Sequence, residues 1–159
     1  MSPADTTPDP TSVHRRTLHD EVAALLRQHG QRYTDGRRRV VSLLVRAERP
    51  VTLPEILAGD AELSQSSVYR TLDVLEQAGV VTRIVAAPDH AHFELAEPLL
   101  GHHHHLICVE CGTIEDVHLD DVVERVVDGA LASAAAEAGF KPLHHSLDLH
   151  GQCGDCASG

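Results

Sequence analysis

The first half of the chain repeats its apolar positions with the period of an α-helix. Residues 15–29 carry leucine and valine three and four positions apart, and a second helix is predicted after the capping residue Thr34. Thr52–Glu55 is a capping box with proline in the first turn, which predicts a short third helix. Ser64 begins a fourth predicted helix, SQSSVYRTLDVLEQAG, which ends at a glycine.

The pattern changes after the fourth helix. The β-branched segment VVTRIV at residues 80–85 predicts a strand, Pro88-Asp89 a turn, and His92–Leu95 a returning strand. Helices closed by a β-hairpin are the arrangement of a winged helix-turn-helix domain, in which Ser64–Ala78 is the recognition helix. The pattern also fits a helical mini-domain that contacts no DNA.

The second half of the chain predicts a small unit with two strands before one helix and a third strand after it. The expected elements are strands at 102–109 and 113–118, an amphipathic helix at 119–138 and a third strand at 144–150. So small a unit has little core, which favours metal binding and dimerisation. The predicted fold is α+β, with a disordered tail at 1–12, one domain at 13–96, a hinge at 97–101 and a second domain at 102–159.

Charge separates the same two halves. Residues 1–83 carry 11 of the 13 Lys and Arg and 11 of the 24 Asp and Glu, so the net charge of −11 comes from residues 84–159. That second half also holds ten of the 13 histidines, which suits a cation binder, while the arginine-rich half can meet DNA phosphates. The sequence contains neither a membrane span nor a signal-like N-terminal segment, so we expect a cytoplasmic protein that does not enter a membrane.

The segment GHHHHLICVECG at residues 101–112 concentrates the candidate chemistry. Cys108 and Cys111 form one Cys-x-x-Cys pair, and Cys153 and Cys156 form a second. In a reducing compartment, two such pairs favour a four-thiolate Zn²⁺ site over disulfides. Two thioredoxin-like redox pairs are the alternative, but neither pair follows a strand and begins a helix in the predicted pattern.

The four histidines alternate if this segment is extended. His103 and His105 then face one side and His102 and His104 the other, so one strand supports two half-sites. Carboxylates for such sites are present in the same half of the chain, and imidazole with carboxylate suits Fe²⁺, Zn²⁺ and related metals. A histidine-rich solvated loop is the simpler alternative, although it leaves the adjoining cysteines unexplained.

Taken together, HHHHLICVECG, SSVYRTLDVLEQAGVV, HFEL and HHSL…GQCGDC resemble the ferric uptake regulator (Fur) family of metal-dependent bacterial repressors. The resemblance runs in order from about Arg15 to Cys156. It implies an N-terminal winged-helix DNA-binding domain hinged to a C-terminal dimerisation domain, and a homodimer that binds double-stranded operator DNA. It also implies that the protein is not an enzyme, and the His-Glu-x-x-His motif of zinc hydrolases is absent.

The resemblance also implies three metal sites. Structural zinc is expected at Cys108, Cys111, Cys153 and Cys156. The regulatory site is expected at Glu94, His103, His105 and Asp116, with His92, or alternatively His90, in place of a family histidine that is missing near Pro50. A further site in the dimerisation domain is expected at His102, His104, Glu124 and His145.

The expected function is a metal-responsive repressor of metal uptake or homeostasis genes, with Fe²⁺ favoured at the regulatory site. A zinc-sensing repressor of the same family is the alternative, although Thr82 and Ala96 replace an Asp and a Cys typical of zinc sensors. A metal store or chaperone is the alternative from another class, and metal-dependent DNA binding separates it from a repressor. The residues expected to contact DNA are Arg32, Arg37, Ser66, Ser67, Tyr69 and Arg70.

Overall fold

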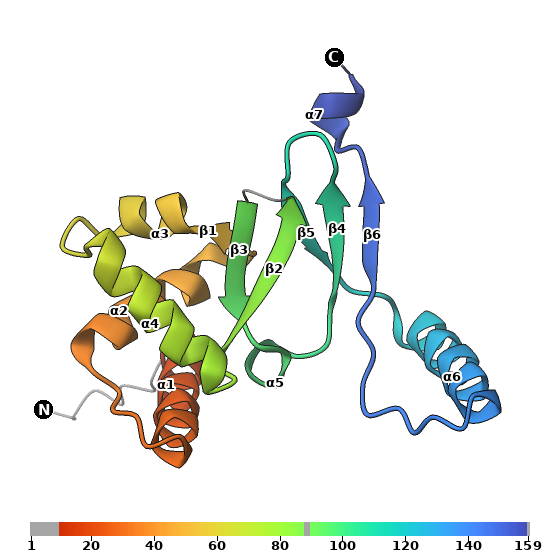
Figure 1. Ribbon diagram of the computed structural model, residues 1–159, viewed down its shortest axis with the longest axis horizontal. Coiled ribbons are helices and arrows are strands. Elements are labelled where there is room, and N and C mark those ends of the chain that lie inside the picture. Colours follow the sequence, from red (N-terminus) through yellow and green to blue (C-terminus); the bar gives the residue numbers. More distant parts are fainter. Residues whose placement is uncertain (1–9, 88–89, 159) are drawn as a thin grey trace, which may run out of the picture. The chain divides into compact units, whose positions relative to one another are not determined.

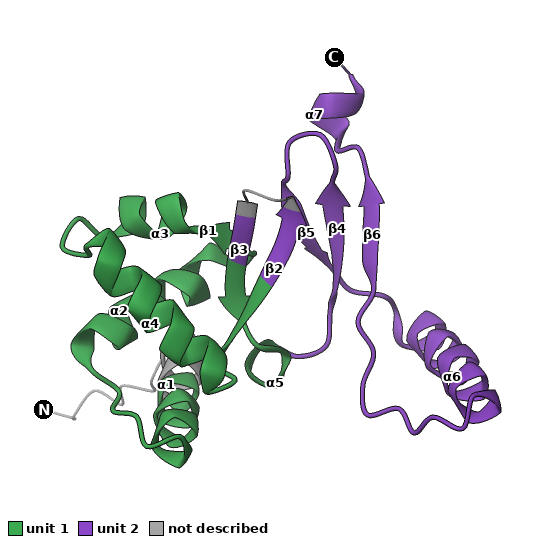
Figure 2. Ribbon diagram, viewed as in Figure 1, with its two compact units in different colours: residues 1–83, 93–100 green, residues 84–92, 101–159 purple. Residues whose placement is uncertain are grey.

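The computed structural model describes residues 10–87 and 90–158, and it has the predicted α+β class (Figure 1). The chain divides into two compact units (Figure 2). Unit 1 takes the residues up to Arg83 together with Phe93–Leu100, and unit 2 takes Ile84–His92 and the residues from Gly101 onward. Residues 1–9 of the predicted tail and the predicted turn at Pro88-Asp89 lie outside the described residues.

Four helices make up most of unit 1: α1 (Pro10–Gln28), α2 (Asp35–Ala47), α3 (Leu53–Gly59) and α4 (Gln65–Gln77). α1 begins at Pro10, before the predicted end of the tail at residue 12. The short helix α5 (Glu97–Leu100), which the sequence did not predict, lies where the hinge was expected.

The predicted caps set where these helices begin. Thr52 donates from its backbone N–H to Glu55 Oε2 at 2.7 Å, which completes the capping box of α3. Burial pushes the pKa of Glu55 upward, but the hydrogen bonds from Thr52 and Arg49 outweigh it and lower that pKa to about 2. At α4, the Ser64 hydroxyl accepts from the Ser67 backbone N–H at 3.4 Å.

The core of unit 1 is mostly aliphatic, because α1 to α4 bury the sides on which valine, leucine and isoleucine recur. α2 packs against α3 and α4, and Val22, Val40 and Val68 have no exposed surface. Gly79 ends α4 with a φ of 68°, a conformation that glycine adopts without strain. The chain then enters a sheet of β1 (Val51–Thr52), β2 (Val81–Ala87) and β3 (His90–Leu95), in the order β1-β3-β2. Four helices followed by this hairpin form the predicted winged helix-turn-helix.

Unit 2 is built on a three-stranded sheet with the order β5-β4-β6. The strands are β4 (His104–Cys108), β5 (Ile114–Val117) and β6 (Asp148–Gly151), with β5 antiparallel and β6 parallel to β4. The predicted third strand at 144–150 was therefore wrong in its first four residues. β6 pairs with β4 from His105↔Asp148 onward, the His105 N–H donates to the Leu147 carbonyl at 3.2 Å, and residues 144–146 lie outside this pairing because β4 begins at His104.

Two helices complete unit 2: α6 (Asp121–Glu137) and α7 (Gly154–Ala157). The carboxylate of Asp120 caps α6 by accepting from the N–H groups of Val122 and Val123 at 2.9 and 3.0 Å. The predicted apolar side of α6 is present but uncovered, since Val122 and Val126 are 63% and 67% exposed. Among the described residues, no helix is both long enough and apolar enough to cross a membrane.

Candidate metal centres

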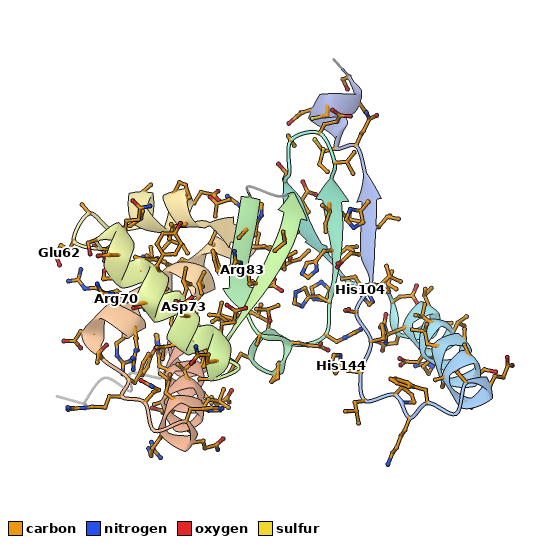
Figure 3. All side chains as sticks on the ribbon, in the orientation of Figure 1. Glu62, Arg70, Asp73, Arg83, His104 and His144 are labelled. Carbon is orange, nitrogen blue, oxygen red and sulfur yellow. The ribbon has the colours of Figure 1, made fainter. Side chains whose placement is uncertain are left out.

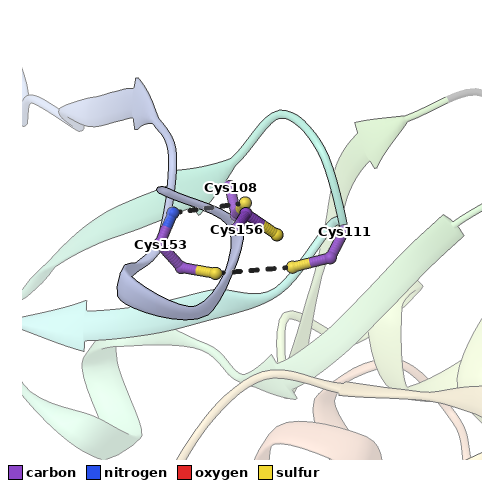
Figure 4. A group of neighbouring side chains, drawn as sticks. All are labelled: Cys108, Cys111, Cys153 and Cys156. Carbon is purple, nitrogen blue, oxygen red and sulfur yellow. Dashed lines mark hydrogen bonds between the residues drawn. The ribbon is translucent and has the colours of Figure 1, made fainter. Parts of the chain in front are cut away.

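The four cysteines meet at one end of the unit 2 sheet (Figure 4). Cys108 ends β4 and Cys111 follows in the turn toward β5, while Cys153 and Cys156 flank the start of α7. Their sulfur atoms all lie within 4.8 Å of one another, and the sulfurs of Cys111 and Cys153 are 3.8 Å apart. Because a disulfide bond is only about 2.05 Å long, these are four free thiols.

Hydrogen bonds shift the pKa values of three thiols in this group, two downward and one upward. The backbone N–H groups of Cys111 and Cys153 point at the Cys108 sulfur and lower its pKa to about 6. The Thr113 side chain, 3.2 Å from the Cys111 sulfur, lowers the pKa of Cys111. Hydrogen bonds with the other sulfurs, that of Cys153 first, raise the pKa of Cys156 to about 12. The group therefore carries negative charge near neutral pH, which attracts a cation.

The spacing of the sulfurs fits zinc. A Zn–S bond of about 2.3 Å in tetrahedral geometry separates neighbouring sulfurs by about 3.8 Å. The distance between Cys111 and Cys153 matches this value. Four thiolates with no carboxylate or imidazole among them are typical of a closed structural site rather than a catalytic one.

A second centre lies in unit 2, between the start of β4 and α6, and its His104 is labelled in Figure 3. Glu124 Oε1 is 2.6 Å from His102 Nε2, and both oxygens of this carboxylate are 3.2 Å from His104 Nε2. His145 Nε2 is 3.2 Å from Glu124 Oε1 and 3.2 Å from His102 Nε2. Three ring nitrogens and one carboxylate thus converge on a single point, which is the donor set of a transition-metal site.

The charge on Glu124 is maintained by its neighbours. Burial alone would raise the pKa of this carboxyl group, but the hydrogen bonds from His104 and His102 outweigh burial and lower it. Glu124 lies in the first turn of α6, because the helix begins after its cap, Asp120, four residues earlier. His104 is held by packing, since its side chain is only 1% exposed.

A third group of donors lies on the other side of the same segment. His103 and His105 have their ring centroids 5.1 Å apart, and the ligand atoms of His103, His105 and Asp116 lie within 4.8 Å of one another. Asp116 reaches this group because it pairs with His105 across the β4–β5 ladder. The four histidines therefore face alternate sides, as the extended segment predicted.

The two remaining predicted ligands lie on β3. Glu94 belongs to unit 1 and is buried, with 5% exposure. His92 belongs to unit 2 and is also buried, with 6% exposure, but it is not part of the group formed by His103, His105 and Asp116. The parts of Glu94 and His92 in a metal site remain predictions from the sequence.

The residues predicted to contact DNA lie on unit 1, and most are exposed. Ser66, Tyr69 and Arg70 line the outer side of α4, where Arg70 is seen in Figure 3, and Tyr69 is 49% exposed. Ser67 is exposed but donates its hydroxyl to the Ser64 carbonyl at 2.8 Å.

The loop before α2 holds the other two predicted DNA contacts. Arg32 is exposed, whereas Arg37 is tied to this loop, since it donates to the Arg32 carbonyl and to Gln31 Oε1 at 3.0 Å. Arg37 thus stabilises the entry to α2, a role that its place in an arginine run did not reveal.

The sequence also missed two aspartates that touch histidines predicted to be metal ligands. Asp128 Oδ1 lies 3.0 Å from His145 Nδ1, and Asp148 Oδ1 lies 3.1 Å from His105 Nδ1. Asp128 stands one helical turn after Glu124, a signal that the sequence offered. Asp148 faces His105 only because of the strand register, which the sequence did not reveal.

Comparison with known proteins matches this architecture to one family. The model of the ferric uptake regulator family matches residues 28–150. A ferric uptake regulation protein of Campylobacter jejuni is 34% identical over 152 residues, which cover 91% of this chain and 92% of that protein. The crystal structure of the Vibrio cholerae ferric uptake regulator is 28% identical, with a TM-score of 0.64 over 80% of this chain and 96% of that one. A zinc-bound manganese uptake regulator is also 28% identical, with a TM-score of 0.59 over 86% and 98%.

Proposed function

The chain belongs to the ferric uptake regulator family, and from this premise we propose that it is an iron-responsive repressor of metal uptake or homeostasis genes. The family consists of metal-responsive transcription regulators that bind DNA, so the protein is a regulator and not an enzyme. The finer points are the sensed metal, the ligands of each site and the genes that are controlled.

The observation that carries the proposal is the separation of donor types within unit 2. Sulfur donors gather at one end of the sheet, whereas nitrogen and oxygen donors gather at the His102–His105 segment. Thiolates hold zinc tightly and suit a permanent site. Imidazole and carboxylate ligands bind Fe²⁺ and exchange it more readily, which a sensor requires.

The cysteine centre fits structural zinc, with Cys108, Cys111, Cys153 and Cys156 as its ligands. Bound there, zinc supplies a cross-link between the β4–β5 turn and the segment around α7. This cross-link replaces the core that unit 2 lacks, since Ile107 and Ile114 are its buried aliphatic side chains among the described residues.

The regulatory site that we propose consists of His103, His105, Asp116 and Glu94, with His92 as a fifth ligand. Glu94 comes from unit 1 and the two histidines from unit 2, so the site depends on residues of both units. A metal held by all of them selects one arrangement of the chain from those that the free protein samples. Near-complete conversion needs a preference of roughly 5 kcal/mol for the selected state.

Linkage makes this coupling reciprocal. If the metal tightens operator binding, operator DNA tightens metal binding by the same factor. Equal metal affinity with and without the operator would therefore remove the regulatory site from the proposal.

Zinc sensing is the second candidate, and the centre at His102, His104, Glu124 and His145 favours it. Three imidazole nitrogens and one carboxylate suit Zn²⁺ as well as Fe²⁺. The related manganese uptake regulator was solved with zinc bound, which shows that metals other than iron bind within the family.

The DNA-binding domain that we propose is residues 13–96, with a hinge at 97–101 and a dimerisation domain at 102–159. The exposed side of α4 suits a major groove, because Tyr69 can contact thymine methyl groups and Arg70 can reach bases or phosphates. Arg32 lies in an exposed loop from which it can reach the DNA backbone.

A homodimer is supported by two uncovered surfaces of unit 2. The apolar side of α6 is exposed, and all four residues of β6 are exposed at the edge of the sheet. An exposed strand edge and an apolar helix face are the features that pairing with a second copy would cover. A dimeric repressor of chromosomal genes acts in the cytoplasm, where we place this protein.

The test is a fluorescence-anisotropy titration of an operator that lies upstream of a metal-uptake gene. Protein with its cysteine-bound zinc intact is titrated at buffered free Fe²⁺, Zn²⁺, Mn²⁺ and Ni²⁺. For each metal, the free concentration that gives half of the effect is compared with the free concentration available in the cell. We expect this ratio to be lowest for Fe²⁺. Binding that is insensitive to every metal would contradict the proposal, and it would favour a metal store if the histidines still bind metal.

A further inference from the structure

Two aspartates that belong to none of the three proposed metal centres accept hydrogen bonds from histidines of those centres. Asp128 on α6 accepts from His145 Nδ1 at 3.0 Å, and Asp148 on β6 accepts from His105 Nδ1 at 3.1 Å. Each aspartate therefore serves a different histidine centre of unit 2.

The hydrogen bonds fix which nitrogen of each ring faces its centre. In a neutral imidazole, the nitrogen that donates to a carboxylate carries the proton, and the other nitrogen keeps its lone pair. His145 Nε2 faces Glu124 and His102, each 3.2 Å away, and when a metal occupies this centre the Asp128 contact keeps the proton on Nδ1 and leaves the Nε2 lone pair for the ion. By the same rule, His105 presents Nε2.

Local structure explains why these two aspartates are in reach. Asp128 is four residues after Glu124 on α6, so both carboxylates lie on one face of the helix. Glu124 contacts Nε2 of His145 and Asp128 contacts Nδ1. Asp148 is directly opposite His105 in the parallel β4–β6 pairing, on the same side of the sheet.

The other ligand histidines are held in different ways. His103 Nδ1 lies 3.0 Å from the Gly101 carbonyl oxygen, which no side-chain substitution removes. His104 is buried, and its Nδ1 has no hydrogen-bond partner among the described residues, so packing rather than an outer carboxylate holds the side of the ring that faces away from Glu124. Asp128 and Asp148 thus differ from these groups in being side-chain carboxylates that contact a histidine ring from outside its centre.

We propose that Asp128 and Asp148 are positioning residues, each of which orients one histidine and raises the metal affinity of one centre without affecting the other. This inference rests on the proposed function, because it requires that both histidine centres bind metal. Carboxylates in this role raise metal affinity by about 10- to 100-fold. The two side chains are 62% and 43% exposed, so water weakens both hydrogen bonds and we expect about tenfold for each.

The experiment uses the full-length protein with its cysteine-bound zinc intact. Zn²⁺ affinity is measured against a competing chelator in Asp128→Ala and Asp148→Ala, each made in two backgrounds. Glu124→Ala leaves only the His103–His105 centre active, and His103→Ala leaves only the Glu124 centre active. We expect Asp128→Ala to weaken only the Glu124 centre and Asp148→Ala to weaken only the His103–His105 centre.

The asparagine variants separate orientation from charge. An asparagine oxygen can still accept from the ring N–H, so Asp128→Asn and Asp148→Asn should recover most of the lost affinity. In the zinc-loaded protein, nuclear magnetic resonance should detect a protected Nδ1–H proton for His145. That signal should disappear in Asp128→Ala and persist in Asp128→Asn. A general loss of stability would not produce this difference between the two variants.

Each possible outcome decides a different point. If both alanine variants weaken the two centres equally, or if neither weakens its own centre, the positioning roles are refuted. Asparagine variants as weak as the alanine variants would refute orientation as the cause. If the parent protein binds no Zn²⁺ beyond the cysteine centre, the proposed function fails at its metal sites and this inference fails with it. Alanine is a strong helix former, so Asp128→Ala should fold normally.

Discussion

Replacing Cys108 with serine tests whether unit 2 depends on a structural metal. The Cys108 side chain ends β4, is 4% exposed and contributes one of four converging sulfurs. Serine keeps the size and the hydrogen-bonding capacity of the side chain but replaces the thiolate that zinc prefers. Loss of metal, rather than loss of packing, is therefore the dominant effect of this substitution.

The magnitudes favour a large loss. Among the described residues of unit 2, the buried aliphatic side chains are Ile107 and Ile114. Each contributes roughly 1.5–3 kcal/mol through burial, or about 3–6 kcal/mol for both. A four-cysteine zinc site contributes roughly 10–16 kcal/mol of apparent free energy. The metal therefore outweighs this core, and we expect Cys108→Ser to unfold unit 2 and abolish dimerisation.

Three measurements on the same preparation check this expectation. Elemental analysis should show that tightly bound zinc, about one ion per chain in the parent, is lost. Light scattering should show a monomer, and circular dichroism should lose strand signal while the helices of unit 1 remain. His103→Ala is the matched control, because it removes a ligand of the same unit but should leave a folded dimer with cysteine-bound zinc.

The reasoning would be refuted by the opposite pattern. A Cys108→Ser protein that remains dimeric and metal-responsive would show that unit 2 has another source of stability. If His103→Ala instead aggregated, the structural and regulatory roles would have been assigned to the wrong centres.

Three further predictions concern unit 1 and the dimer. Tyr69→Ala should flatten the preference among operator variants, whereas Arg32→Ala should weaken all sequences about equally and reduce the salt dependence of binding, both measured by anisotropy. Because the pKa of Glu55 is lowered to about 2, its contribution is complete above pH 4.5 and is lost as pH falls toward 2. Glu55→Gln should therefore cost about 1 kcal/mol at pH 7 and less at pH 2.5 in urea unfolding, a value reduced for exposure. Val126→Glu should place charge on the apolar side of α6 and shift the protein toward monomer in light scattering, and an unchanged mass would contradict the proposed interface.

Much of the fold could be predicted because its signals are local. The capping box at Thr52 and the cap at Ser64 set helix starts through contacts within three residues. Alternation in the His102–His105 segment correctly separated two groups of donors, since side-chain direction in an extended chain depends only on parity.

The parts that could not be predicted depend on distant pairing. The contact between Asp148 and His105 follows from a strand register across 43 residues, and no local pattern encodes that register. The third strand was predicted too long for the same reason, because the alternation at 144–146 lies outside the pairing with β4. The apolar face of α6 was visible in the sequence, but its exposure in a single chain was not.

The parallel pairing of β4 with β6 has a consequence for the order of folding. β5 joins β4 through the five residues 109–113, and Ile107 pairs with Ile114 seven residues away, whereas β6 pairs with β4 across 43 residues. Each doubling of a loop raises its closure cost by about 0.6 kcal/mol, so this step costs about 1.6 kcal/mol more than the hairpin. The helices of unit 1 need no such return, and local contacts form fastest. Unit 1 should therefore fold first. Unit 2 should remain open until zinc captures the second cysteine pair, which makes metal supply a rate-determining condition for the appearance of mature protein.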